Sequence, residues 1–518
     1  MSAIITDQFR ILSAENFRAG IASTGSSYYV WVGLPNATEL SPTWNTSPPA
    51  PIDSLNQENR YWDTMIALKK INASDIRRVV EKYVWASGEK YDMYRHDYSR
   101  NNLAPVSNST TLYSSKYYII NRDYRVYICL DNGFSPENPT GKPSLDEPLF
   151  TDLEPRAAGS SGDGYVWKYL YTLTPSDILR FESTNFIPVP EDWKTGSANA
   201  AVRDNAATSG QIKIVTISNR GTGYGTATTY SNVDILGDGD GAKASVTVNA
   251  DGKIESVDVS SGGSGYSFGT LDLEGAGITN TNASTDAVTS VVIPPNGGHG
   301  SDIYSELGAR KVMVYSRLEN DSANPDFITG NEFARIGVVK DPLVYGSTTK
   351  LSSDKASAVY ALRVTGSQLD QIEFTPDDVI TQTIGFGSTA IGRVVSWDSN
   401  TGVLKYWQDD RVATSSTVGT APLYGYKLLR FQNTLPDGDL SASFNIAGGT
   451  ATVAIDTSFT GISTVLNNRT YFLGQTFDKG VANPEVKPQS GQIIYVDNRP
   501  SVLRSSNQKE DIKIVLEF

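Results

Sequence analysis

Short runs of alternating apolar and polar residues, each closed by a turn, limit what this chain can fold into. The last 29 residues show the pattern clearly, because Ile493 to Asp497 alternates and Ile512 to Phe518 alternates again. Asn498-Arg499-Pro500 follows the first run and predicts a turn between the two. We therefore expect two C-terminal strands, the second of which holds the terminus in a sheet.

Helical patterning is confined to the first third of the chain. A short amphipathic helix is predicted from Phe9 to Phe17, ended by Gly20. A second helix of about three turns is predicted through Tyr61 to Lys69, with Asp53 or Ser54 as its cap. Strands are predicted next at Val79 to Trp85, Tyr117 to Asn121, Tyr124 to Leu130 and Tyr165 to Leu173.

An internal repeat follows Ala198, where Ala, Gly, Ser and Thr become abundant. IKIVTISNRGTGY from Ile212 aligns without gaps on IESVDVSSGGSGY from Ile254, 42 residues later. Each copy alternates before a Gly-x-Gly-Tyr turn, and a further strand begins at Val233 and at Leu271. Two copies are fewer than a solenoid needs to cover its ends, so we expect a compact Gly-rich β module.

A second all-β region is predicted further along. Ala358 to Val364, Ala390 to Trp397 and Val403 to Trp407 alternate around the turn Asp398 to Gly402. This pattern is typical of a small barrel or a pair of meanders. Scaffold strands are expected before this region, at Val291 to Ile293, Lys311 to Ser316 and Ile336 to Val339. The scaffold is expected to resume near Ser490.

A chain of 518 residues is too long for one core, so several domains are expected. We predict a mainly β (β-rich α+β) fold with few short helices. A discontinuous scaffold would carry two inserted all-β modules. The scaffold comprises residues 1–205, 287–348 and 484–518, the Gly-rich module residues 206–286, and the barrel-like module residues 349–483.

Composition excludes several classes of function. Cys129 is the single cysteine, so an internal disulfide or a multi-cysteine metal site is excluded. His96 and His299 are the two histidines, both in polar, turn-like sequence where a solvated or hydrogen-bonded role is expected. The net charge of −13 disfavours nucleic acid and anionic membranes as partners. No signal peptide and no membrane-spanning run is visible, and we predict no metal and no cofactor.

Two glycine-rich loops resemble ligand sites at first sight. In GDGDGAKA, Gly237 to Ala244, Asp238 and Asp240 alternate as in the first half of a calcium loop. The twelfth position, where such a loop carries Glu, is Asn249, which favours a tight turn. GFGSTAIG, Gly385 to Gly392, lacks the spacing of a dinucleotide fingerprint and the ending of a P-loop, so it too predicts a turn.

No nucleophile motif is complete. GSSGDG, Gly159 to Gly164, has Asp163 where a nucleophile elbow needs glycine. We therefore predict no catalytic residue and no enzyme activity. Carboxylates are numerous, however, so a glycosidase pair remains open as an alternative.

Aromatic residues gather in two places. Between Lys82 and Arg100, tyrosines and Trp85 alternate with basic residues, a composition that suits nucleic-acid stacking or a protein interface. The acidic chain favours an interface or structural role for this segment, and we expect it to be exposed. Trp397, Tyr406 and Trp407 suit either an oligonucleotide-binding barrel face or a barrel core, and we favour the core.

Three separated segments resemble one known family. They are PPAPIDS, Pro48 to Ser54, with YWDTMIALKKI from Tyr61 and Asp75 to Trp85; GDGYVWKYLY, Gly162 to Tyr171; and the final segment from Ser490. In their residues and in their order along the chain they resemble the gene-eight baseplate wedge proteins of T-even-like contractile-tailed phages. The resemblance covers roughly residues 1–205, 290–345 and 484–518.

This resemblance implies a structural protein of the virion tail baseplate, made late in the host cytoplasm. It implies a homodimer that joins other wedge subunits in a six-fold baseplate, with no nucleic acid and no membrane as partner. It implies nothing for the two insertions. A tail-associated polysaccharide hydrolase and a host-surface binding module are the alternatives.

Overall fold

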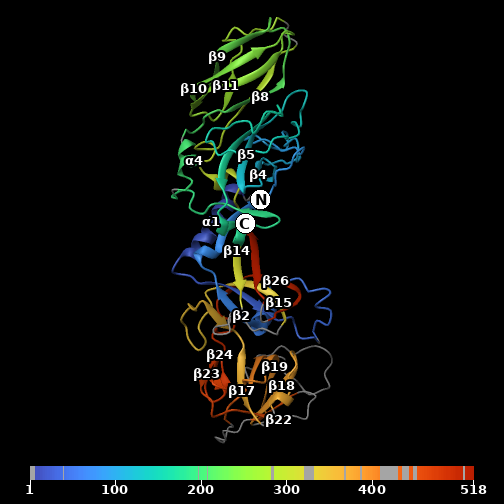
Figure 1. Ribbon diagram of the computed structural model, residues 1–518, viewed down its shortest axis with the longest axis vertical. Helices are drawn as coiled ribbons and strands as arrows, with labels where there is room; N and C mark the ends of the chain where they lie inside the picture. The colour runs from blue at the N-terminus through green and yellow to red at the C-terminus, as the bar shows by residue number, and fades with distance from the viewer. Residues whose placement is uncertain are drawn as a thin grey trace. The chain divides into compact units, whose positions relative to one another are not determined.

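The computed structural model describes residues 6–38, 40–196, 198–206, 208–281, 285–319, 332–366, 369–385, 388–408, 430–434, 443–446, 452–505 and 508–518. The fold is mainly β, as predicted, with several sheets and few helices (Figure 1). The chain forms two compact units. Unit 1 comprises Met1–Arg18, Arg77–Met313 and Ile514–Phe518, and unit 2 comprises Ala19–Ile76 and Val314–Lys513. Each unit is therefore assembled from segments far apart in the sequence.

Strands of two sheets contribute to the aromatic core of unit 1. A three-stranded sheet contains β4 (Tyr118–Ile120), β5 (Arg125–Asn132) and β6 (Tyr165–Thr172). A four-stranded sheet has the order β27 (Glu510–Glu517), β14 (Lys311–Leu318), β3 (Ile76–Glu81) and β7 (Phe186–Pro188). The helices are α1 (Asp7–Ala22), α3 (Pro175–Phe181), α4 (Ala200–Asn205) and α5 (Ile303–Glu306). The buried side chains between these elements include Tyr94, Tyr117, Tyr127, Trp167, Tyr171 and Trp193.

The Gly-rich segment has a core of its own, built from small and branched residues. One sheet has the order β11 (Ile254–Ser264), β10 (Asp240–Val248), β9 (Thr228–Gly237) and β12 (Gly269–Leu271), and β8 (Ile214–Asn219) pairs with β13 (Val288–Val292). The two repeat copies end alike, since Tyr224 and Tyr266 are both buried and both accept a backbone hydrogen bond. Each copy of the repeat therefore forms a strand followed by a turn, and the tyrosine after that turn is buried and binds backbone through its hydroxyl.

The second predicted helix is partly wrong. It begins as expected, because Ser54 caps α2 (Leu55–Thr64), but it ends at Thr64. Met65–Lys70 forms β2 instead, paired with β1 (Tyr28–Gly33), and its first four residues are all buried. A continuous apolar run fits a strand covered on both faces, and the sheet overrides the helical pattern. The first helix also runs past Gly20, to Ala22.

The predicted C-terminal turn is also wrong. Asn498-Arg499-Pro500 lies inside β26 (Gln492–Leu503), the edge strand of a sheet ordered β16 (Lys355–Ser357), β2, β1, β15 (Glu332–Lys340) and β26. The register between β15 and β26 shifts between Phe333 and Arg335, opposite this segment. An edge strand with a bulge can accommodate proline, because no ladder hydrogen bond is lost there. The terminal strand β27, by contrast, is confirmed and pairs with β14.

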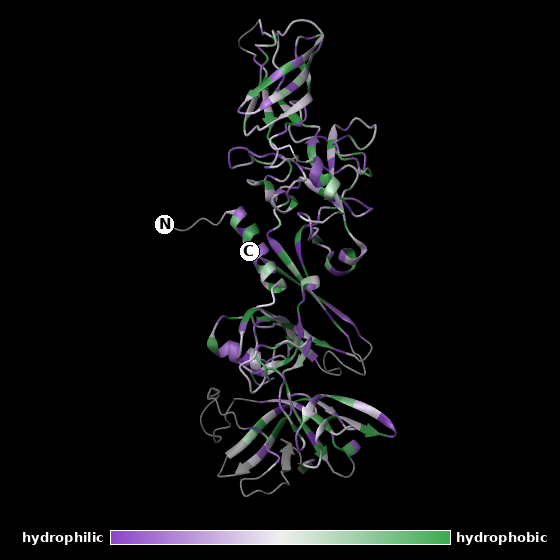
Figure 2. Cartoon of the chain, turned by 90° about the vertical axis from the view of Figure 1, so that its left-hand side faces the viewer, coloured by the Kyte–Doolittle hydropathy of each residue, from purple (hydrophilic) through white to green (hydrophobic). Residues whose placement is uncertain are grey.

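The remaining strands lie in unit 2. Strand β20 (Val403–Gln408) pairs with β19 (Ser388–Asp398) and with β17 (Tyr360–Thr365). The pairings continue through β18 (Val379–Gly385), β21 (Ser443–Ile446) and β22 (Thr452–Ile455) back to β17, so the strands close into a ring. The short β25 (Val481–Ala482) also pairs with β17, and β23 (Gly461–Leu466) and β24 (Arg469–Phe477) form a separate hairpin. Figure 2 shows hydrophobic and hydrophilic residues following one another along these strands.

Candidate functional site

The loop Gly159–Gly164 is a structural turn that starts β6. The Asp163 carboxylate is largely buried and accepts hydrogen bonds from the backbone of Leu145 at 2.9 Å and Tyr165 at 3.0 Å. Gly164 has φ +84°, and a Cβ there would lie 2.8 Å from the Cα of Gly133. The glycine and the aspartate thus serve the close approach of two loops.

The Asp238 loop closes the β9–β10 hairpin. The exposed carboxylate of Asp238 is bonded by the Ser267 hydroxyl, and it accepts from the backbone of Ser267 at 2.9 Å and of Phe268 at 3.2 Å. These hydrogen bonds lower the pKa of Asp238 to about 2. Asp240 lies in β10 opposite Ser264. In the part of the chain that the structure describes, no three His, Cys, Asp or Glu side chains are grouped to hold a metal ion.

The other glycine-rich loop, Gly385 to Gly392, joins β18 to β19. Gly385 and Ser388 face each other across its turn. Residues 386 and 387 lie outside the described residues.

The expectation of an exposed aromatic–basic segment at Lys82 to Arg100 is wrong. Tyr91, Tyr94 and Tyr98 are buried in the core of unit 1 or at its margin. Arg95 pairs with the neighbouring Asp97 at 2.8 Å. Strand β3 ends at Glu81, and the following residues cross the core in irregular backbone, which their aromatic side chains fill. This segment therefore offers no aromatic docking face.

In the barrel Tyr406 is part of the core and Trp397 packs against it, as predicted, whereas Trp407 is buried outside that core. Tyr406 and Trp407 are buried, and the indole of Trp397 donates to the carbonyl of Ile372 at 2.9 Å. Tyr406 packs between Tyr360, stacked at 5.6 Å, and Phe431, edge-on at 4.9 Å. Rings held between other rings cannot stack on bases, so the oligonucleotide-binding interpretation loses its support.

The histidines and the cysteine are all held by the fold. His96 is exposed and accepts from the backbone of Ile293 at 3.2 Å. His299 is buried, with its Nδ1 2.7 Å from the carboxylate of Glu306 and its ring edge-on to Tyr94. Burial raises the pKa of the Cys129 thiol, which suits an inert apolar residue of β5.

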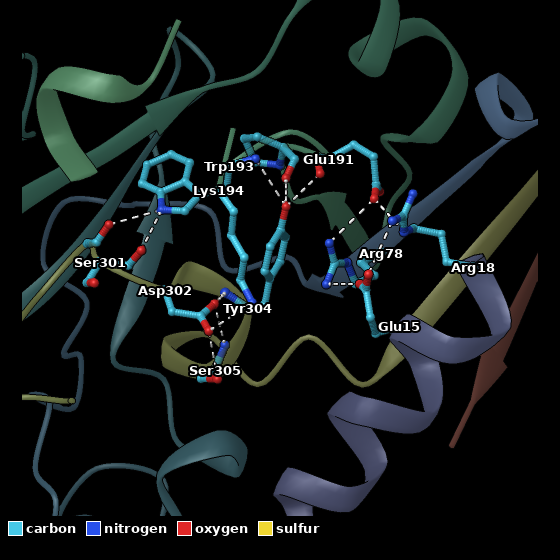
Figure 3. Close-up of polar contacts among 12 residues, drawn as sticks. Glu15, Arg18, Arg78, Glu191, Trp193, Lys194, Ser301, Asp302, Tyr304 and Ser305 are labelled. Carbon is cyan, nitrogen blue, oxygen red and sulfur yellow. Dashed lines mark hydrogen bonds and ion pairs between the residues drawn. The ribbon is translucent and has the colours of Figure 1, made fainter. Parts of the chain in front are cut away.

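Sequence reasoning missed a group of four charged side chains in unit 1, which we call the charge cluster: Glu15, Arg18, Arg78 and Glu191 (Figure 3). Arg78 is buried, and its guanidinium nitrogens lie 2.5 Å from Glu15 and 3.4 Å from Glu191. Arg18 lies 3.2 Å from Glu15 and 2.7 Å from Glu191. Two residues of α1 are thereby joined to β3 and to the loop that follows β7.

Tyr304 of α5 supports the charge cluster from one side. The Arg78 guanidinium carbon lies 3.3 Å from the centre of the Tyr304 ring. The Tyr304 hydroxyl lies 2.8 Å from the carbonyl oxygens of Pro190 and Glu191 and accepts from the backbone of Trp193 (Figure 3). Asp302 caps α5 by accepting from the backbone of Tyr304 at 3.1 Å. Hydrogen bonds to backbone thus fix the position of Tyr304, and the Tyr304 ring in turn supports Arg78 of the cluster.

The two carboxylates of the charge cluster have opposite pKa shifts. Burial raises the pKa of Glu191 despite Arg78 and Arg18. Burial also acts to raise the pKa of Glu15, but the two arginines outweigh it and the pKa is lowered. Such a divergent pair is typical of an acid and a nucleophile in catalysis. Here, however, the Arg78 guanidinium lies between them, where a glycosidic oxygen would have to enter. The ion pairs therefore hold α1 against β3 and the loop that follows β7.

Unit 2 contains a different buried arginine, Arg335 of β15. Its guanidinium nitrogens donate to the side chains of Thr64, Asn36 and Asn498, all neutral acceptors. The rings of Trp44 and Tyr61 lie 4.9 and 5.3 Å from it. Burial lowers its pKa to about 9, so it stays charged at neutral pH. Among the described residues no carboxylate forms an ion pair with Arg335.

A cleft of about 440 Å³ lies beside Arg335 in unit 2. Its walls include Asn36, Trp44, Asp377, Trp407 and Leu503. Asp377 is already engaged, because it accepts from the backbone and hydroxyl of Thr38 and pairs with Arg393 at 3.1 Å. The volume suits a small ligand, but both tryptophans are buried and show no open face for a sugar ring.

Helix α1 and strand β23 are among the elements that carry exposed apolar residues. On α1, Phe9 and Leu12 are 59% and 54% exposed on neighbouring turns. On β23, Val465 is 66% exposed, near Ile462 at 40%. Side chains of this kind are typical of surfaces that become buried in complexes. In the described part of the chain no helix is long and apolar enough to cross a membrane.

Comparison with known proteins gives one informative similarity. No family model matches the chain. The baseplate wedge protein gp8 of Enterobacteria phage T4 is 27% identical over 231 residues. The match covers 39% of this chain and 66% of the T4 protein, slightly less than two thirds of its length. The chain is therefore distantly similar to a phage baseplate wedge protein.

Proposed function

We propose that this protein is a structural subunit of the baseplate wedge in a contractile phage tail. The similarity to the T4 wedge protein carries the proposal. The motifs support it, since each loop that resembled a ligand site has a structural role wherever its residues are described. On this proposal the chain lies in the virion tail, contacts other wedge subunits of a six-fold plate, and catalyses no reaction.

The rival function, hydrolysis of a surface polysaccharide, has less support. It requires two carboxylates facing each other across a space that a sugar can enter. The pair Glu15 and Glu191 has the divergent pKa shifts but encloses Arg78 instead of a substrate. Although burial raises the pKa of Glu191, the Arg78 guanidinium fills the space between the two carboxylates that a sugar would have to enter.

The finer proposal is a homodimer. The resemblance to the wedge proteins implies it, whereas the Tyr83 to Tyr98 segment does not support it, because Tyr91, Tyr94 and Tyr98 are buried. The exposed pair Phe9 and Leu12 on α1 is a better candidate for a self-complementary surface. Light scattering at micromolar concentration should give twice the chain mass, and Leu12→Glu should return it to one chain mass. A monomer in solution and in assembled tails would refute the dimer but not the wedge assignment.

We also propose that the Gly-rich segment and the barrel are insertions in a discontinuous scaffold, at residues 206–286 and 349–483. The separate core of the Gly-rich strands supports the first. Because β13 pairs with β8, a deletion should extend to residue 293 so that neither strand is left alone. Replacement of residues 208–293 by a short Gly/Ser link should leave a soluble, folded remainder.

The deciding experiment uses purified tails. Mass spectrometry and particle imaging should find the chain in the baseplate, in a copy number divisible by six, and virions lacking it should have no complete baseplate. Purified chain incubated with host polysaccharide should release no sugar above buffer. Absence of the chain from tails, or sugar release abolished by substitution of a single carboxylate, would contradict the proposal.

A further inference from the structure

The hairpin β23–β24 has an edge that no other described strand covers. Among the described residues strand β23 pairs only with β24, while β24 also lies close to β17 and β25. The base of the hairpin is anchored, because Leu473 and Phe477 are buried and Gln475 donates to the carbonyl of Val359 at 2.6 Å. A two-stranded sheet is marginal in water unless a further strand or helix covers it.

The geometry of the turn determines which backbone groups face outward. Asn467 and Asn468 both have positive φ, 51° and 61°, the signature of a two-residue type I′ turn. Leu466 and Arg469 flank that turn as a hydrogen-bonded pair, so pairing alternates from there along the ladder. The N–H and C=O groups of Val465 and Ser463 consequently point away from β24. Both residues are exposed.

Three other edge strands of this molecule, β26, β4 and β6, have contacts along their outer side. Edge strand β26 receives the indole of Trp44 at the carbonyl of Arg499, at 2.8 Å, and the backbone N–H of Ser501 donates to Asn45 at 3.0 Å. Strand β4 is bridged by Val84, and β6 is bridged by Arg156. Strand β23, with the sequence GISTVL, has no such contact from the described residues, and it contains neither the lysine nor the proline that often protects a free edge. Its one irregularity lies at the base, between Gly461 and Ser463.

The charge of the hairpin differs from that of the chain. Residues 461–477 contain Arg469 as their single charged side chain, in a chain of net charge −13. The segment therefore does not repel an acidic partner, and Arg469 at the tip can pair with one carboxylate. Ser463 and Phe472 share one face of the hairpin with Val465, so an incoming strand would find apolar contacts at alternate residues.

We propose that, in the assembled tail, β23 is extended by a third strand from a neighbouring tail protein. The occupant is an extended peptide segment with apolar residues at alternate positions and a carboxylate opposite Arg469. Backbone hydrogen bonds to Ser463 and Val465 supply the affinity, as in other cases of strand addition. This inference rests on the proposed function, because it presupposes that the chain is built into a tail.

Hydrogen exchange measured on the full chain, free and in purified tails, tests it. Peptides covering Ser463 and Val465 should exchange rapidly in the free chain and at least about tenfold more slowly in tails. Equal exchange rates in both states would overturn strand addition while the wedge assignment stands. Absence of the chain from tails would overturn both.

A matched pair of variants tests the edge itself. Val465→Pro removes the outward N–H of β23, and Thr470→Pro removes the outward N–H of the opposite residue on β24; neither loses a bond of the hairpin ladder. Each is produced with an equal amount of wild-type chain, and their ratio in tails is read by mass spectrometry. The ratio for Val465→Pro should fall about tenfold, and that for Thr470→Pro should stay near one. Equal incorporation of both variants, or a lysine at 465 that leaves the exchange protection intact, would contradict the proposal.

Discussion

Two buried arginines show two ways of keeping a charge inside this molecule. Arg78 in unit 1 lies between two carboxylates, on the face of Tyr304. Arg335 in unit 2 is bound by neutral oxygens and lies between two aromatic rings. At the Arg78 site, the hydration that the guanidinium loses on burial is replaced by two full negative charges. At the Arg335 site it is replaced by the dipoles of neutral side chains and by the negative faces of aromatic rings. We therefore expect the first site to respond strongly to substitution and to pH, and the second weakly.

The largest effect is expected for Arg78→Met. Removal of the guanidinium leaves Glu15 and the partly buried Glu191 with Arg18 as their only partner in the cluster, which should cost about 3 kcal/mol. The free energy of local opening, from hydrogen exchange of α1 amides, measures it. Arg77→Met on the same strand is the control, since Arg77 contacts Asp177 outside the cluster. A loss in Arg78→Met no larger than in this control would show that α1 is held by packing alone.

The same difference should shrink in acid. The pKa of Glu15 is lowered in the folded chain, so its contribution is present above the ordinary glutamate pKa of 4.5 and is lost as pH falls through the folded pKa. Glu191, with a raised pKa, becomes neutral first on acidification and no longer needs the arginine. The difference between wild type and Arg78→Met should therefore lose roughly half its value between pH 7 and pH 3. A constant difference over that range would indicate that Arg78 acts through its hydrocarbon stem and Tyr304.

A smaller and pH-independent effect is expected for Arg335→Met. The substitution leaves the oxygens of Thr64, Asn36 and Asn498 without this donor but removes a desolvated charge, so we expect a net loss of about 2 kcal/mol. Exchange of β15 amides measures it at pH 7 and pH 4. Strong pH dependence here would reveal a carboxylate partner and abolish the contrast with Arg78.

The smallest effect is expected for Thr64→Val. This near-isosteric change removes one acceptor of Arg335 and the bond from Thr64 to the carbonyl of Arg60, at about 1 kcal/mol. Urea unfolding monitored through β15 exchange should detect it. If Thr64→Val costs as much as Arg335→Met, the main role of Thr64 is to stabilise the end of α2, and its bond to Arg335 is secondary.

Sequence reasoning succeeded where the signal is local. Alternation predicted β5, β6, β14 and β27, and the Gly-x-Gly-Tyr repeat predicted a strand before each locked turn. It failed at Met65–Lys70 because a run buried on both faces has no period, and at Pro500 because a register shift let an edge strand continue. It also wrongly predicted that Tyr91 to Tyr98 is exposed, because protein cores and protein interfaces are both rich in aromatic residues.

The charge cluster could not be predicted for a different reason. Glu15 and Arg18 are three residues apart on one helix, which is a readable signal. Arg78 and Glu191 come from distant strands and loops, and nothing local in the sequence indicates that they meet. Only the fold brings these four charges together, so a search for motifs passes over this site.

The distribution of each unit along the chain has a consequence for synthesis on the ribosome. Unit 1 contains both the first helix and Ile514–Phe518, and the ring of Phe17 lies 5.4 Å from that of Phe518. Unit 2 needs β26 to complete its five-stranded sheet. Neither this sheet nor the four-stranded sheet of unit 1 is complete before β26 and β27 have been synthesised. A chain cut short before Gln492 leaves both sheets with missing strands and unpaired edges, so we expect such a fragment to be degraded or to aggregate rather than to fold.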